Sequence, residues 1–183
     1  GLSCQSSSTH GYSSGAASPS PTNIIDKFTY SSDGNATDVG DMIATNTNTT
    51  GQSSNTHGYI SGGTGATMNH IEKFSFASDG NATDTADLTV GVSSPAGQSS
   101  STHGYASGGA PNTDTIGKFS FLSNANATDV GNLTVARHYV SGQSSTTHGY
   151  SSGGNGAKNI IDKFTFASDA DATDVGDLIN NSY

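Results

Sequence analysis

Four histidines recur once in each of four similar stretches of the chain, and their spacing is the first feature that could support chemistry. His10, His57, His103 and His148 stand 47, 46 and 45 residues apart. If the four stretches surround a common axis, the four imidazoles could bind one metal ion, because imidazole nitrogen is a common metal ligand. The alternative, which we favour, is that each imidazole forms hydrogen bonds that tie neighbouring strands or loops together.

An acidic phrase rich in side-chain oxygen is the second candidate. Asp33–Asp38 and Asp79–Asp84 both spell Asp-Gly-Asn-Ala-Thr-Asp, in which oxygen-bearing side chains alternate much as in calcium-binding loops. The third stretch breaks the pattern with Asn124 and Ala125, and no stretch supplies the glutamate of an EF-hand loop. We therefore favour turns in which Asp and Asn accept hydrogen bonds from local backbone amides. We expect no cofactor, with calcium or a histidine-bound metal as the open alternatives.

Serine, histidine and aspartate occur together in every stretch, which raises the question of a hydrolase. A catalytic triad needs one nucleophile, one base and one orienting acid in a single cleft that differs from its surroundings. Here the phrases that contain these residues are almost interchangeable, and His70 and His138 lie in variable segments without an obvious partner. We expect no enzymatic activity.

The elements that must position these residues are β-strands. Serine, threonine and glycine dominate the composition, and glutamate, a strong helix former, occurs only at Glu72. Each stretch begins with Gln-Ser-Ser-x-Thr-His-Gly-Tyr, at Gln5, Gln52, Gln98 and Gln143. Each continues with Ile-x-Lys-Phe-x-aromatic, at Ile25–Tyr30, Ile71–Phe76, Ile116–Phe121 and Ile161–Phe166. The two aromatic residues of this phrase stand two apart, which places them on one face of a strand.

Each repeat therefore predicts three or four short antiparallel strands, and the whole chain predicts an all-β fold. A repeat of about 45–47 residues that holds one small sheet is typical of a β-propeller blade, because neighbouring blades cover both faces of each sheet. The Gly-Gly after a short strand, as in Ser61-Gly62-Gly63, followed by an aromatic strand and a turn, resembles kelch repeats, although the tryptophan of kelch repeats is missing. The His-Gly-Tyr-x-Ser-Gly-Gly and Lys-Phe-x-Phe phrases also look like repeat arrays in predicted structural proteins of marine and cyanobacterial bacteriophages.

The repeat boundaries predict one β-propeller domain over residues 1–183, with blades at about 5–51, 52–97, 98–142 and 143–183 plus 1–4. The fourth repeat is four residues short of the previous spacing, and residues 1–4 make up that difference. This predicts a ring that closes through the two ends of the sequence, which would remove exposed sheet edges. The alternatives are an excised stretch of a longer array and a subunit that stacks with copies of itself.

Charge excludes two classes of partner. The chain carries 15 acidic and 6 basic residues, a net charge of −9. Nucleic acid and anionic membrane surfaces both need a basic face, so we expect neither as a partner. Cys4, the only cysteine, excludes an intramolecular disulfide framework and a cysteine zinc site.

Loops vary between the repeats while the strand phrases do not. The variable segments are Ala16–Asn23, Thr64–His70, Ala110–Thr115, Asn155–Asn159, Ala44–Thr50, Gly91–Ala96 and Ala136–Val140. Loops on one rim of a propeller commonly form its recognition surface. We expect a non-enzymatic structural and adhesive module, extracellular or in a virion, where the resemblance to phage proteins implies other virion proteins as partners and self-association is open. The alternative is a secreted carbohydrate-binding propeller that holds cell-surface glycans with Asp, Asn and aromatic groups such as Tyr105 or Tyr150.

Overall fold

The fold is known from a computed structural model that describes residues 1–17, 19–155 and 159–180. The described residues form sixteen strands and one short 3-10 turn, η1 (Gly65–Thr67). The first sheet contains β1 (Ser3–Ser6), β2 (His10–Ala16), β3 (Thr22–Thr29) and β4 (Thr37–Asp41). The second sheet contains β5 (Thr50–Ser53), β6 (His57–Ser61), β7 (His70–Ser75) and β8 (Thr83–Asp87). The third sheet contains β9 (Ala96–Ser99), β10 (His103–Ser107), β11 (Thr115–Ser120) and β12 (Thr128–Asn132). The fourth sheet contains β13 (Ser141–Ser144), β14 (His148–Ser152), β15 (Ile160–Thr165) and β16 (Thr173–Asp177).

Every sheet is an antiparallel meander whose strands pair in chain order. In the first sheet Gln5 pairs with Tyr12 and Tyr12 pairs with Lys27. The third and fourth strands of each sheet pair with an irregular register, at Ile25 and Asp26 in the first sheet, so these outer pairs carry a bulge. The fold class predicted by the repeats, an all-β chain of four propeller blades, is confirmed, and each blade has four strands.

The His-Gly-Tyr phrase needs its glycine because an aromatic ring lies flat on it. A Cβ atom at Gly58 would stand 2.3 Å from the ring of Phe74, the residue that pairs with it on the next strand. The same 2.3 Å approach recurs between Gly104 and Phe119. The glycine thus lets the ring reach across its own sheet and contact the neighbouring sheet.

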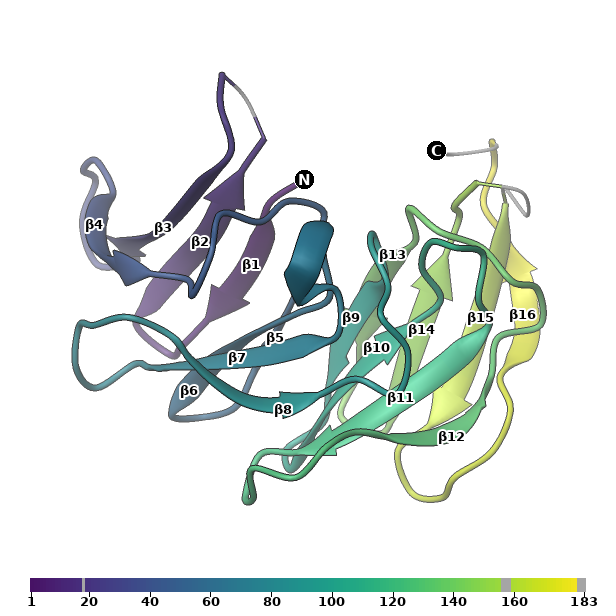
Figure 1. The fold of residues 1–183 in the computed structure, drawn as a ribbon. Helices are drawn as coiled ribbons and strands as arrows, with labels where there is room; N and C mark the ends of the chain where they lie inside the picture. The colour runs from purple at the N-terminus through teal and green to yellow at the C-terminus, as the bar shows by residue number, and fades with distance from the viewer. Residues whose placement is uncertain (18, 156–158, 181–183) are drawn as a thin grey trace.

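The sheets follow one another along an arc, and each consecutive pair encloses an apolar core (Figure 1). We call these contacts the first, second and third junctions, in chain order. Tyr12, Ile25 and Met42 of the first sheet meet Phe74 and other residues of the second in the first junction. Ile25, Ile71 and Ile116 hold equivalent positions and are 1% exposed or less. The hydrophobic effect therefore acts between sheets, since a single sheet has no core of its own.

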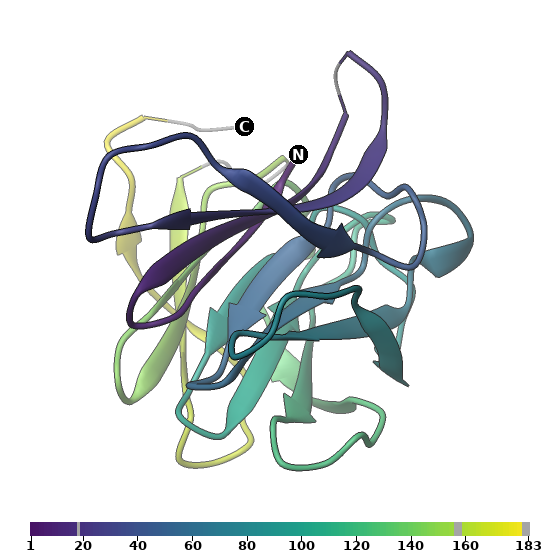
Figure 2. The same cartoon turned by 90° about the vertical axis from the view of Figure 1, so that its left-hand side faces the viewer.

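Closure of the ring is not seen in the described residues. No core cluster, aromatic contact or hydrogen bond joins the fourth sheet to the first, and Figure 2 shows the first sheet in front with no other sheet drawn over it. The four residues of β13 are all exposed.

The assignment of residues 1–4 to the fourth blade is wrong. Ser3 and Cys4 pair with Ser14 and Ser13 in the first sheet. The sheets also begin slightly before the predicted boundaries, because Thr50, Ala96 and Ser141 already belong to the first strand of the following sheet. The physical reason is local, since each first strand forms a tight hairpin with the strand that follows it.

Candidate functional site

The four histidines share one local role at the first hairpin of each sheet. Each begins the second strand of its sheet, and its Nδ1 lies 2.8–2.9 Å from the hydroxyl of the preceding threonine. The backbone N–H of each histidine donates to a serine hydroxyl in the same turn, as from His10 to Ser7. Within the described ranges, no group of three or more His, Cys, Asp or Glu side chains could hold a metal ion. Each imidazole thus hydrogen bonds within its own turn, to the residue that precedes it, and not to a neighbouring strand or blade through this nitrogen.

Two of these histidines are held toward the neutral form. Burial lowers the pKa of His57, and the positive charge of Lys73 lowers it further. Burial also lowers the pKa of His103, and Lys118 adds to this effect while Asp169 opposes it. A neutral imidazole can accept a hydrogen bond from the threonine hydroxyl, which agrees with the hairpin geometry.

The acidic phrase makes two kinds of contact. Asp38, Asp129 and Asp174 each accept the backbone N–H two residues further on, as predicted, and an earlier residue of the phrase joins two sheets. The side-chain oxygen of Asn81 in the second sheet accepts the backbone N–H of Asp41 in the first, at 3.0 Å. Asn126 repeats this contact with Asp87, and Asp171 repeats it with Asn132. The preference for capping of local amides is therefore wrong for these three residues. The amides that they reach belong to the preceding sheet, where a β-strand has left them without a ladder partner.

Lysines add a second contact between the same elements. Lys27 of the first sheet forms an ion pair with Asp79 of the second, and Lys118 of the third pairs with Asp169 of the fourth. In the middle junction Lys73 donates to Asn124 Oδ1 at 2.9 Å. The turn residues that suggested calcium ligation thus serve as acceptors for the neighbouring sheet.

Aromatic residues fill each junction. The ring of Tyr12 lies 5.3 Å from Phe74 and 4.9 Å from Phe76, measured between centroids. Tyr59 meets Phe119 and Phe121 in the same way, and Tyr105 meets Phe164 and Phe166. Tyr105 is only 2% exposed, so the expectation that Tyr105 helps to hold a glycan is wrong.

A buried glutamine completes the repeated contact. Gln5 Nε2 donates to the backbone carbonyl of Tyr59 at 3.0 Å, Gln52 donates to that of Tyr105, and Gln98 donates to that of Tyr150. Each junction therefore contains three repeated contacts between one sheet and the next. A tyrosine packs on an aromatic pair, a lysine contacts an acidic or amide turn residue, and a glutamine donates to a backbone carbonyl. This shared set explains why these residue types recur at a fixed period.

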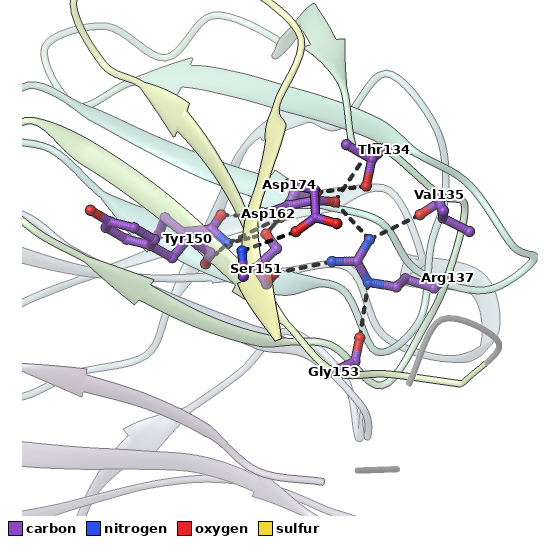
Figure 3. Close-up of polar contacts among 11 residues, drawn as sticks. Thr134, Val135, Arg137, Tyr150, Ser151, Gly153, Asp162 and Asp174 are labelled. Atoms are coloured by element: carbon purple, nitrogen blue, oxygen red, sulfur yellow. Dashed lines mark hydrogen bonds and ion pairs between the residues drawn. The ribbon is translucent and has the colours of Figure 1, made fainter. Parts of the chain in front are cut away.

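One buried contact differs among the three junctions. It lies between the segment that joins two sheets and the third strand of the second of them. In the third junction, the segment between sheets supplies Arg137, whose guanidinium donates to Asp162 of the fourth sheet at 2.7 Å (Figure 3). Arg137 also donates to the carbonyls of Val135, Ser151 and Gly153, and both charged side chains are fully buried. Thr134 donates to both carboxylate oxygens of Asp162. The pair is thus enclosed, and each guanidinium nitrogen and both carboxylate oxygens have a hydrogen-bond partner, the condition under which a buried ion pair is tolerated.

The equivalent places in the other junctions carry no ion pair. In the second junction Val92 replaces the arginine and Gly117 replaces the aspartate, and both line a cavity of about 10 Å³, close to the smallest that holds one water. In the first junction Asn46 and Glu72 stand there, both 2% exposed, and Glu72 accepts the backbone N–H of Ile43 at 3.0 Å. The sequence offered two signals for these residues, the single arginine of the chain and the change among Asp26, Glu72, Gly117 and Asp162 within a constant strand phrase.

The variable segments lie on one rim, between the second and third strands of a sheet or between successive sheets. Residues 18 and 156–158, in the first and fourth of the loops that follow the second strands, lie outside the described residues, as do residues 181–183 of the fourth predicted blade. The segments between sheets are partly internal, because Asn46, Val92 and Arg137 are buried. Their variation therefore reflects packing as well as surface.

One exposed group spans this rim across the third junction. His138 Nδ1 approaches the side-chain oxygen of Asn112, and its Nε2 lies 3.2 Å from the side-chain nitrogen of Asn155. Tyr139, beside it, is 54% exposed and has a positive φ of 58°, a conformation uncommon for residues other than glycine. We call Asn112, His138, Tyr139 and Asn155 the rim patch. His138 thus has the partners that the sequence did not reveal.

The opposite rim is formed by the repeated serine and threonine turns. A shallow depression there lies between the third and fourth sheets and is lined by Ser100, Thr102, Thr147 and Phe166 among others.

Among the residues that the structure describes, no helix is long and apolar enough to cross a membrane. No protein-family model matches the chain, and no curated protein matches it significantly.

Proposed function

We propose that the chain is a non-enzymatic structural and adhesive module, in which a rigid row of sheets presents variable loops on one rim to a partner. The observation that carries the proposal is the separation of the two kinds of residue. Residues that repeat build the junctions, as Tyr105 and Gln98 do, whereas the longer segments that differ between repeats, such as the one that contains the exposed Tyr139, lie on one rim. Binding residues are commonly placed on loops that a rigid scaffold positions.

An extracellular or virion setting agrees with this arrangement and with the resemblance of the repeats to phage structural proteins. The junctions are rich in short polar side chains and backbone hydrogen bonds, and the surface carries few cations. We propose other virion proteins or cell-surface molecules as the partners. The rim patch is the first surface to test, because it combines an exposed aromatic ring with amide groups, a composition common in binding surfaces.

Binding of the labelled chain to bacterial cells tests the proposal. We expect saturable binding that falls about tenfold or more in an Asn112→Ala/Tyr139→Ala variant, since exposed aromatic residues often dominate recognition. Leu122→Ala is the matched control, because Leu122 is 86% exposed on the opposite rim. An absence of saturable binding, or an equal loss in the control, contradicts the proposal.

Carbohydrate binding is the second candidate, and the depression lined by Ser100, Thr102, Thr147 and Phe166 favours it. Hydroxyl groups beside an aromatic ring provide the hydrogen bonds and the apolar face that sugars need. A glycan array separates the two candidates. Selective glycan binding that Thr147→Ala weakens and Tyr139→Ala does not would favour this rim over the rim patch.

A further inference from the structure

Each junction joins two different faces of a sheet. One face, which we call the leading face, carries the tyrosine, the lysine and the first-strand glutamine. The other, which we call the trailing face, carries the aromatic pair and the acidic turn that receive them. The leading faces of the first three sheets meet the trailing faces of the last three. This leaves the trailing face of the first sheet and the leading face of the fourth outside the junctions.

The trailing face of the first sheet is uncovered. Phe28 is 43% exposed and Tyr30 is 55% exposed. Phe74, Phe119 and Phe164, which hold the position of Phe28 in the other sheets, are 4% exposed or less. Among the described residues, Asp33 and Asn35 have no partner like those of Asp79 and Asn81 in the second sheet. A complete set of acceptors is thus available on this face.

The leading face of the fourth sheet is uncovered in the matching way. Tyr150 is half-buried, and the described part of the chain offers no aromatic partner from another sheet and no ion pair for Lys163. Gln143 is exposed, whereas its counterparts Gln52 and Gln98 are 1% exposed. Ile161 and Leu178 are only half-buried beside these residues. This face holds a complete set of donors and an open apolar edge.

We propose that these two faces bind one another between two copies of the chain, which associate head to tail through a further copy of the junction. Tyr150 of one copy would lie between Phe28 and Tyr30 of the next, and Lys163 would face Asp33. The charges are complementary, as in the Lys27–Asp79 and Lys118–Asp169 pairs within the chain. A head-to-tail contact is heterologous, so it builds a ring if the rotation closes and a filament if it does not.

Cys4 opposes this contact. Its equivalents are Gly51, Gly97 and Gly142, and each of these lies against the backbone of the preceding sheet. A Cβ atom would stand 2.1 Å from the Cys4 carbonyl oxygen at Gly51, and 2.2 Å from the Gly97 carbonyl oxygen at Gly142. Real contacts never come so close. Cys4 therefore places a side chain where the other junctions accept only glycine, and it is exposed on the trailing face.

The Cys4 side chain also accounts for the absence of a junction between the fourth and the first sheet of one chain. If the fourth sheet approached the first as the third approaches the fourth, the Cys4 side chain would meet the Gly142 carbonyl. Overpacking of this kind forces the backbone to shift. Cys4 thus weakens the contact at the first sheet without changing the aromatic slot or the lysine acceptor. The contact uses the end faces and not the rim patch, so its test is independent of the proposed adhesion.

Light scattering and sedimentation of the wild-type chain and a Cys4→Gly variant test the proposal. We expect concentration-dependent association of the Cys4→Gly chain, about tenfold or more tighter than that of the wild type, since removal of the overpacked atom relieves the strain. Adding Tyr150→Ala to Cys4→Gly should return the mass to that of one chain, 18.4 kDa. A Cys4→Gly chain that stays at 18.4 kDa at every concentration, or an association that Tyr150→Ala leaves unchanged, overturns the proposal.

A charge exchange tests the head-to-tail geometry. In the Cys4→Gly background, Lys163→Asp and Asp33→Lys each place like charges across the contact, so each variant alone should associate about tenfold more weakly. In a mixture of the two, the new aspartate of one chain faces the new lysine of the other, and the unchanged Lys163 faces the unchanged Asp33 at the next contact, so every contact between unlike chains is favourable. We expect the mixture to associate about as strongly as the Cys4→Gly chain, with the two variants in alternating order. Variants that associate as strongly alone as in the mixture would overturn the head-to-tail arrangement.

Discussion

Tyr105 and Tyr150 hold the same position in successive sheets, yet they differ in how deeply they are buried. Tyr105 is 2% exposed and lies 5.4 Å and 4.9 Å from two phenylalanine rings of the fourth sheet. Tyr150 pairs across its own sheet with a glutamine and a lysine, as Tyr105 does, but no aromatic residue of a further sheet contacts it among the described residues. The comparison shows that burial in this protein comes from the next sheet in the row, as expected for repeats that contact only their neighbours.

The three junctions differ at one buried position, the one that holds the Arg137–Asp162 pair in the third junction. The third junction contains the Arg137–Asp162 pair, the second contains Val92 and Gly117, and the first contains Asn46 and Glu72. An ion pair, an apolar contact and a hydrogen-bonded carboxyl group thus occupy one site in a constant frame. The tyrosine and its aromatic pair are the same in every junction, whereas the residues at the positions of Arg137 and Asp162 vary.

The largest expected difference in stability is between alanine variants of Tyr105 and Tyr150. Tyr105→Ala should lower the free energy of unfolding by about 3–5 kcal/mol, because it empties a packed aromatic site. Tyr150→Ala should cost less than about 1 kcal/mol in dilute solution, since its ring is already partly exposed. Urea unfolding of both variants measures the difference. Equal losses would contradict the account of the end faces.

The buried ion pair allows the third junction to be broken separately. Arg137→Met should cost about 3 kcal/mol, because Asp162 is left charged and buried. The double variant Arg137→Val/Asp162→Gly reproduces the residues of the second junction. We expect it to be more stable than Arg137→Met, since no unpaired charge remains, and thermal unfolding of both variants checks the order. A double variant that is less stable than the single one would show that the two junctions are not interchangeable.

Glu72 gives the first junction a pH dependence. Burial raises the pKa of Glu72, His70 and the Ile43 amide oppose that rise, and Asp84 adds to it. The folded state therefore holds more protons than the unfolded state above the ordinary pKa of 4.5, and stability falls as the pH rises through the folded-state pKa. Glu72→Gln should remove this fall while the side-chain oxygen still accepts from Ile43. Unfolding measured from pH 4 to pH 8 tests it, and an unchanged slope would contradict it.

The smallest difference concerns the lysines. Lys118→Ala should cost about 0.5 kcal/mol, and the cost should vanish at high salt, because the Lys118–Asp169 pair is close to solvent. Lys163→Ala should have no measurable effect in dilute solution. Comparing the two variants by unfolding at low and high salt tests this, and a salt-dependent loss from Lys163→Ala would indicate that the fourth sheet has a partner in the chain.

The repeat period predicted the sheets well because period-2 aromatics and glycine turns act locally. The Ile-x-Lys-Phe phrase became the third strand of every sheet, and the His-Gly-Tyr phrase became the second. Such phrases state which strands form and which neighbours they pair with along the chain.

Contacts between sheets were harder to predict, because they join residues up to 64 positions apart, and their side chains have several suitable partners. Asn81 could cap its own turn or an amide of the preceding sheet, and only the packing of the sheets decides between them. The pairing of Arg137 with Asp162 required the segment between sheets to turn inward. Closure of the ring depends on the angle between successive sheets, which the repeat period does not specify.

Nuclear Overhauser contacts between aromatic rings in the dilute monomer test the central claim most directly, that one repeated junction joins the sheets and is absent between the fourth and the first. The account predicts contacts from Tyr12, Tyr59 and Tyr105 to the aromatic pair of the next sheet, and none from Tyr150 to Phe28 or Tyr30. Contacts between Tyr150 and Phe28 within a monomer would show a closed ring and contradict it.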